Sequence, residues 1–377
     1  MVDKIVMPDQ TAGYMQRPSG RGLQAHRVLR LGAQLAGQNP TGEDPTGHLA
    51  TDVGVSLSQL GPEVASWSIR KPMTRRTVVL GAWLCPALLF GQDLAPDQKQ
   101  RVDDAIPKKA QAKPKKPRRM LISNLTMRDG HAARGSSFAV IPIHNYAFDQ
   151  MGKRTGAYEA VFSNDIEMFR PDKIKQFDAI CFLNTVGVLF DDPGLRQSLL
   201  AFIAGGKGFV GIHDAMATFV QYPKYDQWPA FGQMLGGTEN GGHLWNGEMM
   251  TIKIEDPKNP INAVFQGQEF QIADQSFQLQ EPALRDHLHV LTSIDVEKTH
   301  LIPGRRIFPA RVEDKDFPVT WIRSYGKGRV FYSALGHGAP VYSNAPLLAH
   351  FLAGIQYALG DLKADSTPSA KLASGKK

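Results

Sequence analysis

The chain has 377 residues, of which 42% are hydrophobic and 21% charged, and a formal net charge of +7 at pH 7. Residues 1–120 carry 18 Lys and Arg against 10 Asp and Glu, whereas residues 121–377 carry 25 against 26. A near-neutral body excludes the concentrated basic face that nucleic-acid binding needs, so we expect no nucleic-acid partner. The two cysteines, Cys85 and Cys181, exclude a disulfide framework and a thiolate metal cluster, and Cys181 lies in an apolar run typical of a core.

The first 92 residues predict no folded domain. Residues 1–72 show little periodicity, and we interpret them as disordered or as a mis-called extension before a true start at Met73. Residues 73–92 place the pair Arg75-Arg76 before an apolar run too short to span a bilayer comfortably, which is typical of an export signal and loosely resembles a twin-arginine signal. An apolar helix in a soluble protein is the alternative. An export signal implies a periplasmic or secreted protein without stable membrane insertion after its removal.

Two further segments flank the domain that we expect to fold. Residues 93–119 include PKKAQAKPKKPRR, where prolines alternate with like charges, and this pattern predicts a basic linker without helix or core. Residues 364–377 predict a disordered polar tail. The working domain is therefore expected over residues 120–363.

Strands and helices alternate in the first half of this domain. Apolar runs predict strands at 120–125, 158–165, 177–185 and 208–213, and helices are expected at 143–151 and, after Asp192-Pro193, at 195–206. This alternation indicates βαβ units and a parallel sheet. Further strands are expected at 249–256, 289–296, 317–325 and 328–335, the last two joined in a hairpin, and a terminal helix at 345–359.

The predicted fold is one α/β domain with a mostly parallel sheet, antiparallel additions and helices on both faces. In such sheets ligands bind beyond the carboxyl ends of the strands. Four ligand-capable side chains follow strand-like or glycine-rich segments, namely His213, His243, Asp274 and His337. None of these four lies in an HxH or HExxH pairing, so folding would have to assemble them.

Two kinds of chemistry fit these residues. Neutral imidazole is a common metal ligand, and three histidines with a carboxylate would suit zinc or another divalent metal. Alternatively, the imidazoles would carry protons or hydrogen-bond sugar hydroxyls without a metal. The sequence leaves both possibilities open. Trp245, beside His243, is a candidate platform for stacking on a sugar.

Several segments together resemble the ThuA-like family, named for trehalose utilisation, whose fold is flavodoxin-like and similar to that of class I glutamine amidotransferases. They are FDAICFLNTVG, GGKGFVGIHDA, WPAFGQMLGG with GGH, PVTWIRSYGKGRVFYSALGH and LLAHFLAGIQYALGDL, and they cover residues 120–363. Class I amidotransferases carry their catalytic cysteine at the turn where this chain has His213. The resemblance therefore implies chemistry on oxidised (3-keto) glycosides or disaccharides, and excludes thiol-dependent glutamine hydrolysis.

From these positions and this resemblance we assign catalytic roles to His213, His337 and Asp274, and we expect Asp274 to orient one of the two histidines. Substrate binding is assigned to His243, Trp245, Gln275 and Asp214, and metal binding to His213, His243 and His337. Two positions depart from the family pattern, because Gln275 stands where Glu is common and Phe138 where His is expected. His131 and His144 lie nearby in the sequence. A carbohydrate-binding protein that has lost catalysis is therefore the alternative function.

Overall fold

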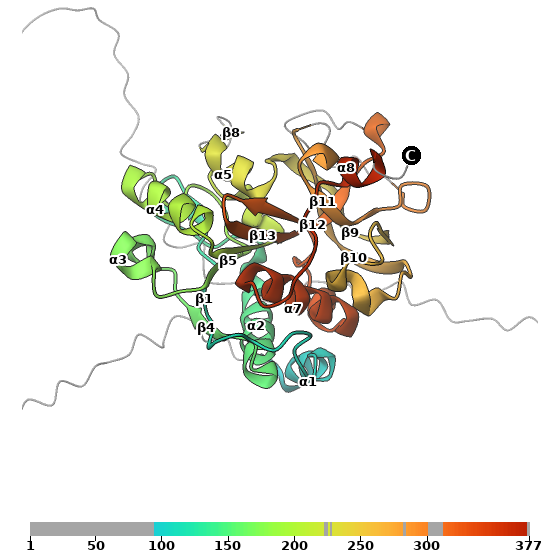
Figure 1. The fold of residues 1–377 in the computed structure, drawn as a ribbon, viewed down its shortest axis with the longest axis horizontal. Helices are drawn as coiled ribbons and strands as arrows, with labels where there is room; N and C mark the ends of the chain where they lie inside the picture. Colours follow the sequence, from blue (N-terminus) through green and yellow to red (C-terminus); the bar gives the residue numbers. More distant parts are fainter. Residues whose placement is uncertain (1–93, 222–224, 227, 282–283, 301–311, 375–377) are drawn as a thin grey trace, which may run out of the picture. The chain divides into compact units, whose positions relative to one another are not determined.

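The computed structural model describes residues 94–221, 225–226, 228–281, 284–300 and 312–374, which fall in one compact unit, Ala82–Lys377. The predicted extension 1–72 and export signal 73–92 lie outside the described residues. A nine-stranded mixed sheet forms the centre of this unit, with helices on both of its faces (Figure 1). The predicted α/β class is confirmed.

One half of the sheet is parallel, as the strand–helix alternation predicted. Its strands lie side by side in the order β4, β1, β5, β6, β13. The middle strands consist almost entirely of buried apolar residues because helices cover both of their faces. The bounds are β1 (Arg119–Ser123), β4 (Glu159–Phe162), β5 (Ala179–Leu183), β6 (Gly208–Ile212) and β13 (Gly328–Ser333).

The other half of the sheet is antiparallel. From β13 it continues through β12, β11 and β9 to β10 at the edge. The predicted hairpin between the last two strands is present, with Tyr325 paired to Gly328. Strand β10, which carries Asp274 and Gln275, was not predicted as a strand. The bounds are β9 (Glu239–Ile254), β10 (Phe270–Leu279), β11 (His289–Ile294) and β12 (Pro318–Tyr325). Two short hairpins join β2 (Met127–Arg128) to β3 (His131–Ala132) and β7 (Val220–Gln221) to β8 (Tyr225–Asp226).

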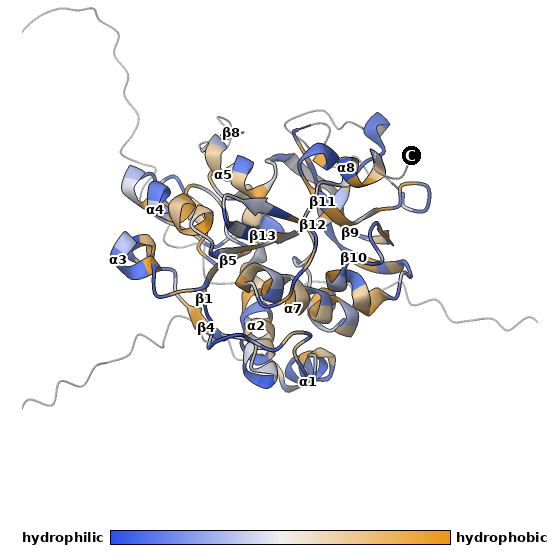
Figure 2. Cartoon of the chain, in the orientation of Figure 1, coloured by the Kyte–Doolittle hydropathy of each residue, from blue (hydrophilic) through white to orange (hydrophobic). Residues whose placement is uncertain are grey.

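Helices α2 and α7 lie on one side of the sheet, and α5 on the other (Figure 1). Helix α4 is apolar towards the sheet and polar on its outer side (Figure 2), and Asp192 begins it by accepting a hydrogen bond from the Leu195 amide. The bounds are α1 (Pro96–Ala105), α2 (Ile141–Thr155), α3 (Pro171–Ile174), α4 (Pro193–Ala204), α5 (Pro229–Leu235), α6 (Ala339–Tyr342), α7 (Ala345–Leu359) and α8 (Ser369–Ser374). Cys181 and Trp321 are buried in the core.

The segment 93–119 differs from the predicted linker. Residues Pro96–Ala105 form α1, which packs on α2 and α7 although it is mostly hydrophilic (Figure 2). Its few apolar side chains, Val102, Ala105 and the following Ile106, share one face and are buried. The prolines and lysines after it form no helix, but Arg118 makes two hydrogen bonds to the buried carboxylate of Asp361. The sequence analysis missed this helix because its apolar stripe is narrow. Such a stripe is sufficient to hold a helix in place where the surface of the domain covers it.

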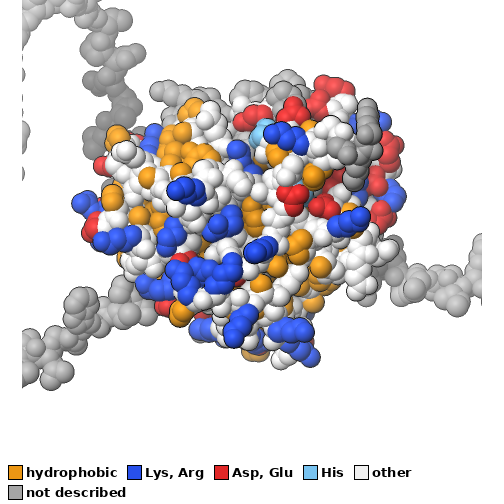
Figure 3. Space-filling model, in the orientation of Figure 1, with side chains coloured by type: hydrophobic (Ala, Val, Ile, Leu, Met, Phe, Trp, Pro, Cys, Tyr) orange, Lys and Arg blue, Asp and Glu red, His pale blue; other side chains and the backbone are white. Residues whose placement is uncertain are grey.

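The predicted disordered tail also differs, because α8 lies within it. The Ser369 amide donates to the carbonyl of Leu288, and His289 Nδ1 donates to the carbonyl of Thr367. Lys and Arg side chains gather over the β1 and β4 end of the sheet (Figure 3), where Lys116 and Lys207 surround Asp178. Among the residues that the structure describes, none of the helices combines the length and apolar character that crossing a bilayer demands.

Candidate functional site

His213 stands at the carboxyl end of β6, where the strand turns into a short 3-10 helix, His213–Ala217. Its φ of 48° lies in the left-handed region, which is uncommon for a residue with a side chain. The side chain is fully buried, and Nδ1 lies 2.6 Å from the carbonyl oxygen of Ala334. The Tyr332 hydroxyl donates to the carbonyl of His213 at 2.7 Å and holds this turn.

His337 lies in the loop that follows β13. Because β13 runs parallel to its neighbour β6, the carboxyl ends of both strands meet at one edge of the sheet. The rings of His213 and His337 approach with centroids 4.9 Å apart. Gly336 makes this close approach possible. Its φ of +128° favours glycine, and a Cβ added at this position would lie only 2.5 Å from Ile212 Cγ2, so no side chain fits. The two histidines therefore share one site.

Asp274 acts on the backbone of this loop rather than on an imidazole. Its Oδ2 accepts from the Gly336 amide at 2.7 Å and its Oδ1 from the Gly338 amide at 2.8 Å, while the His337 amide lies 3.4 Å from Oδ2. Asp274 thus fixes the loop that presents His337. We expected Asp274 to orient a histidine, and in the structure its carboxylate binds the amides of the loop that carries His337.

Ser137 is a member of the site that sequence reasoning missed. Its hydroxyl donates to Asp214 Oδ2 at 2.8 Å and lies 3.2 Å from His337 Nδ1. A carboxylate only accepts hydrogen bonds, so the single hydroxyl proton goes to Asp214 and the contact with His337 is made by an Nδ1–H donor. Ser137 directly precedes Phe138, the position where the family pattern has histidine, and that proximity was the available signal.

The two histidines near Phe138 do not replace a histidine at that position. His131 is exposed in β3, and the Arg134 guanidinium lies over the Phe138 ring at 4.4 Å. His144 is buried beneath the loop, where its Nε2 donates to the carbonyl of His337 at 3.2 Å and its Nδ1 accepts from Asn184. His144 therefore supports the loop from behind.

The remaining predicted residues border this site. Gln275 follows Asp274 on β10, and its side chain raises the pKa of His213 against the larger effect of burial. The backbones of His243 and Trp245 pair with Phe277 and Ser276 on the same strand, and their side chains lie outside what the structure describes. The Phe277 ring lies 4.7 Å from that of His213, so β10 lines one side of the site.

Burial sets the charge of these groups. It lowers the pKa of His213 to about 4, and burial together with the neighbouring His213 lowers the pKa of His337 to about 4, against the influence of Asp214. Burial raises the pKa of Asp274 to about 6, opposed by its hydrogen bonds from the loop amides. At neutral pH both imidazoles are therefore neutral and able to accept a proton or bind a metal.

Three possible metal ligands converge here. One nitrogen each from His213 and His337 and one carboxylate oxygen of Asp214 all lie within 4.8 Å of one another. The ligand set expected from the sequence was His213, His243 and His337. In the described residues Asp214, predicted as substrate-binding, joins the two histidines.

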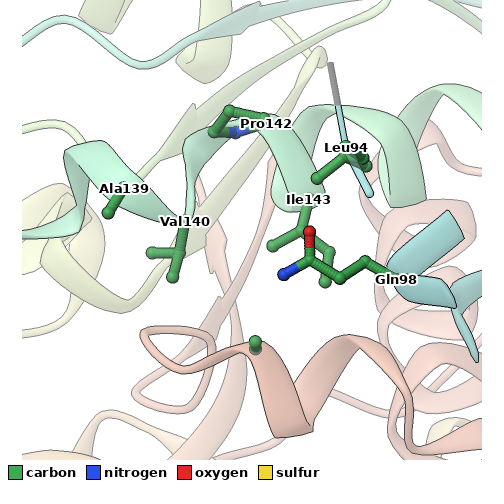
Figure 4. Close-up of a pocket in the computed structure, with 7 residues that line it drawn as sticks. Leu94, Gln98, Ala139, Val140, Pro142 and Ile143 are labelled. Atoms are coloured by element: carbon green, nitrogen blue, oxygen red, sulfur yellow. The ribbon is translucent and has the colours of Figure 1, made fainter. Parts of the chain in front are cut away.

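A separate small pocket lies between the starts of α1 and α2 (Figure 4). It has a volume of about 90 Å³ and is lined mainly by apolar side chains, with Gln98 on one side. Ligand pockets usually measure ~300–1,000 Å³, so this cavity is too small to be the main site.

The comparisons with known proteins agree with the geometry. A ThuA-like protein of Bacteroides uniformis superposes with a TM-score of 0.50 at 19% identity, covering 68% of this chain and 98% of that one, which shows a shared fold. A ThuA-like protein of Parabacteroides merdae gives a TM-score of 0.47 at 16% identity, over 66% of this chain and 93% of that one. A search of curated proteins found no match. The ThuA family profile, described as trehalose utilisation, matches residues 133–358, and the chain therefore belongs to the ThuA family.

Proposed function

We propose that this protein acts on a carbohydrate, an oxidised (3-keto) glycoside or disaccharide, by histidine-based proton transfer. The observation that carries the proposal is the pair of neutral imidazoles, His213 and His337, with ring centroids 4.9 Å apart at the carboxyl edge of the sheet. The family's description as trehalose utilisation supports a sugar substrate.

The acidic proton of such a sugar lies on the carbon next to the carbonyl. His337 is the better placed base, because it is half-buried whereas His213 is fully buried. Its Nε2 would take the proton, the C–H electron pair would move into the new C–C double bond, and the carbonyl oxygen would receive the negative charge. Ser137 then links the imidazolium to the carboxylate of Asp214, which stabilises the charge. A positioned base of this kind contributes ~10²–10⁴-fold.

The proposal is tested by turnover of a 3-keto-disaccharide and of its unoxidised parent. We expect the wild-type protein to convert only the oxidised sugar, and His337→Gln to lose at least about 100-fold in kcat. His287→Gln is the matched control, since His287 contacts the carbonyl of Gly236, away from the site residues. Equal rates for wild type and His337→Gln would refute the assignment.

Carbohydrate binding without turnover is the second candidate function. It is favoured by Gln275 and Phe138, which replace the glutamate and histidine of the family pattern. Calorimetric binding of either sugar, with no conversion of the oxidised one, would establish this function in place of the first.

We propose in addition that the protein is exported to the periplasm or secreted. The support is the pair Arg75-Arg76 followed by an apolar run. N-terminal sequencing of the native protein from fractionated cells tests this: a start shortly after residue 92 in the exported fraction is expected, and an uncleaved chain confined to the cytoplasm would overturn it.

A further inference from the structure

Three side chains with metal-binding atoms meet at the carboxyl edge of the sheet. His213 and Asp214 come from the turn after β6, and His337 comes from the loop after β13. The distance from His213 Nε2 to Asp214 Oδ1 is 3.4 Å, and the potential ligand atoms of all three residues lie within 4.8 Å of one another. A tetrahedral zinc site with bonds of 2.0–2.1 Å places its ligand atoms about 3.3 Å apart. The first pair already has this spacing.

Hydrogen bonds fix which nitrogen of each imidazole is available. His213 Nδ1 faces the Ala334 carbonyl at 2.6 Å, and a carbonyl only accepts, so Nδ1 carries the proton. His337 Nδ1 must likewise donate to Ser137, whose own proton goes to Asp214. Both neutral rings therefore present a lone pair at Nε2. Metal-binding histidines are typically oriented in this way, by a carbonyl or a carboxylate-linked group at the other nitrogen.

In this arrangement two electron-rich atoms face each other. His213 Nε2 carries a lone pair, and the Asp214 oxygen 3.4 Å away belongs to a carboxylate that is 4% exposed. Such a close approach in a buried site is favoured by a hydrogen-bond donor or a positive charge near both atoms. A cation bound by both atoms would remove the repulsion. His213 also has a left-handed backbone conformation, which is uncommon for a residue with a side chain.

We propose that His213 Nε2, His337 Nε2 and a carboxylate oxygen of Asp214 bind a divalent cation of the zinc type. Two imidazoles and one carboxylate form a three-ligand set typical of catalytic zinc, which keeps a fourth position for water or substrate. The distances from the His337 nitrogen to the other two ligand atoms are at most 4.8 Å, and a small movement of this half-buried side chain would bring it within bonding range of the cation. As a Lewis acid, the cation would polarise a sugar carbonyl in place of proton transfer at His337 Nε2, because one lone pair cannot both bind a cation and take a proton. This role rests on the proposed sugar substrate, whereas the binding does not.

The test uses the full chain, stripped of metal with a chelator and titrated with zinc alone by calorimetry. We expect one zinc per chain, with affinity falling more than about 100-fold in His337→Gln and in Asp214→Asn, and ~10–100-fold in Ser137→Ala. His287→Gln should bind zinc as the wild type does. Thermal unfolding of each metal-free variant checks that the fold is retained.

A second variant tests the site through an increase in zinc affinity instead of a decrease. The Gln275 side chain acts on the His213 ring, so Gln275→Glu adds a carboxylate beside the proposed ligands and should tighten zinc binding by about 10-fold. The cobalt-substituted wild type should also show the visible absorption of a tetrahedral site, which His337→Gln should lack.

The metal site is refuted if the wild type does not bind zinc, or if the wild type and His337→Gln bind zinc equally well. Turnover of the keto-sugar by the metal-free protein would leave the proposed function standing without it. Conversely, specific zinc binding without turnover would support the metal site and refute the proposed catalysis, so the two failures are distinguishable.

Discussion

The Ser137 hydroxyl lies 3.2 Å from Nδ1 of His337, in a contact between the segment before α2 and the loop after β13. Since the same hydroxyl donates to Asp214, the contact fixes the His337 tautomer with its proton on Nδ1. The orientation of the other ring nitrogen, Nε2, therefore depends on Ser137, which touches no substrate atom in the proposed step. Ser137 is a positioning residue.

Replacing Ser137 by alanine should lower kcat for the oxidised sugar by about 10–100-fold and leave KM within twofold. The substrate-binding surface remains in this variant, whereas the proton of His337 is no longer fixed on Nδ1. Steady-state kinetics of Ser137→Ala and of Ser343→Ala measure this. Ser343 is exposed near the same loop and bonds only locally, to the Pro340 carbonyl, so its variant should match the wild type. A kcat unchanged in Ser137→Ala would contradict the positioning role.

Asp274→Asn should destabilise the protein by about 1–3 kcal/mol. Both carboxylate oxygens of Asp274 accept from loop amides, and an asparagine must turn an NH₂ group towards one of them. Urea unfolding at neutral pH measures the loss. Asp191→Asn, an exposed change in the loop before α4, serves as the control and should unfold like the wild type. Equal stabilities of the two variants would show that Asp274 does not hold the His337 loop.

Arg118→Met tests whether the segment before β1 is part of the domain. The change leaves the carboxylate of Asp361, whose side chain is 0% exposed, without its bidentate partner. Breaking a buried ion pair costs about 3–5 kcal/mol, and we expect a loss of this size in urea unfolding. Arg101→Met, which removes a solvent-exposed pair with Asp97, should cost less than about 1 kcal/mol. Similar losses for both would mean that the segment contributes little.

Stability should fall as the pH drops from 6.5 towards 4. Burial lowers the pKa of His350 to about 4, so within this window the unfolded state binds more protons than the folded state. Each pH unit costs about 1.4 kcal/mol, and between pH 7 and pH 5 His350 should contribute roughly 2 kcal/mol. Denaturant unfolding at both values should therefore show a smaller loss in His350→Gln than in the wild type. An identical loss would contradict the assignment to His350.

The sequence predicted the parallel half of the sheet because its strands are continuous apolar runs between clear helix boundaries, as in β5, α4 and β6. It missed β10, where polar residues such as Asp274 and Gln275 interrupt the apolar pattern, and α1, whose polar composition hides a stripe of three apolar residues. Strand β10 forms by pairing with β9, and α1 forms by packing on α2 and α7.

The same limit applies to the site. The positions of His213 and His337 followed from strand ends in a parallel sheet, and the structure brings these two rings together. Ser137 could not be found from periodicity, because its importance arises from a hydrogen bond across the fold to Asp214. The contacts of Asp274 could not be predicted either, since a sequence does not reveal that a carboxylate will bind backbone amides.

The most direct test of proton transfer is deuterium exchange at the carbon next to the carbonyl of a 3-keto-disaccharide, followed by NMR in D₂O. Exchange reports removal of the proton even where no net conversion occurs. The wild type should accelerate exchange over buffer, and His337→Gln should reduce that acceleration by at least about 100-fold while His287→Gln keeps it. A wild-type protein that binds the sugar and leaves its exchange at the buffer rate would contradict the account.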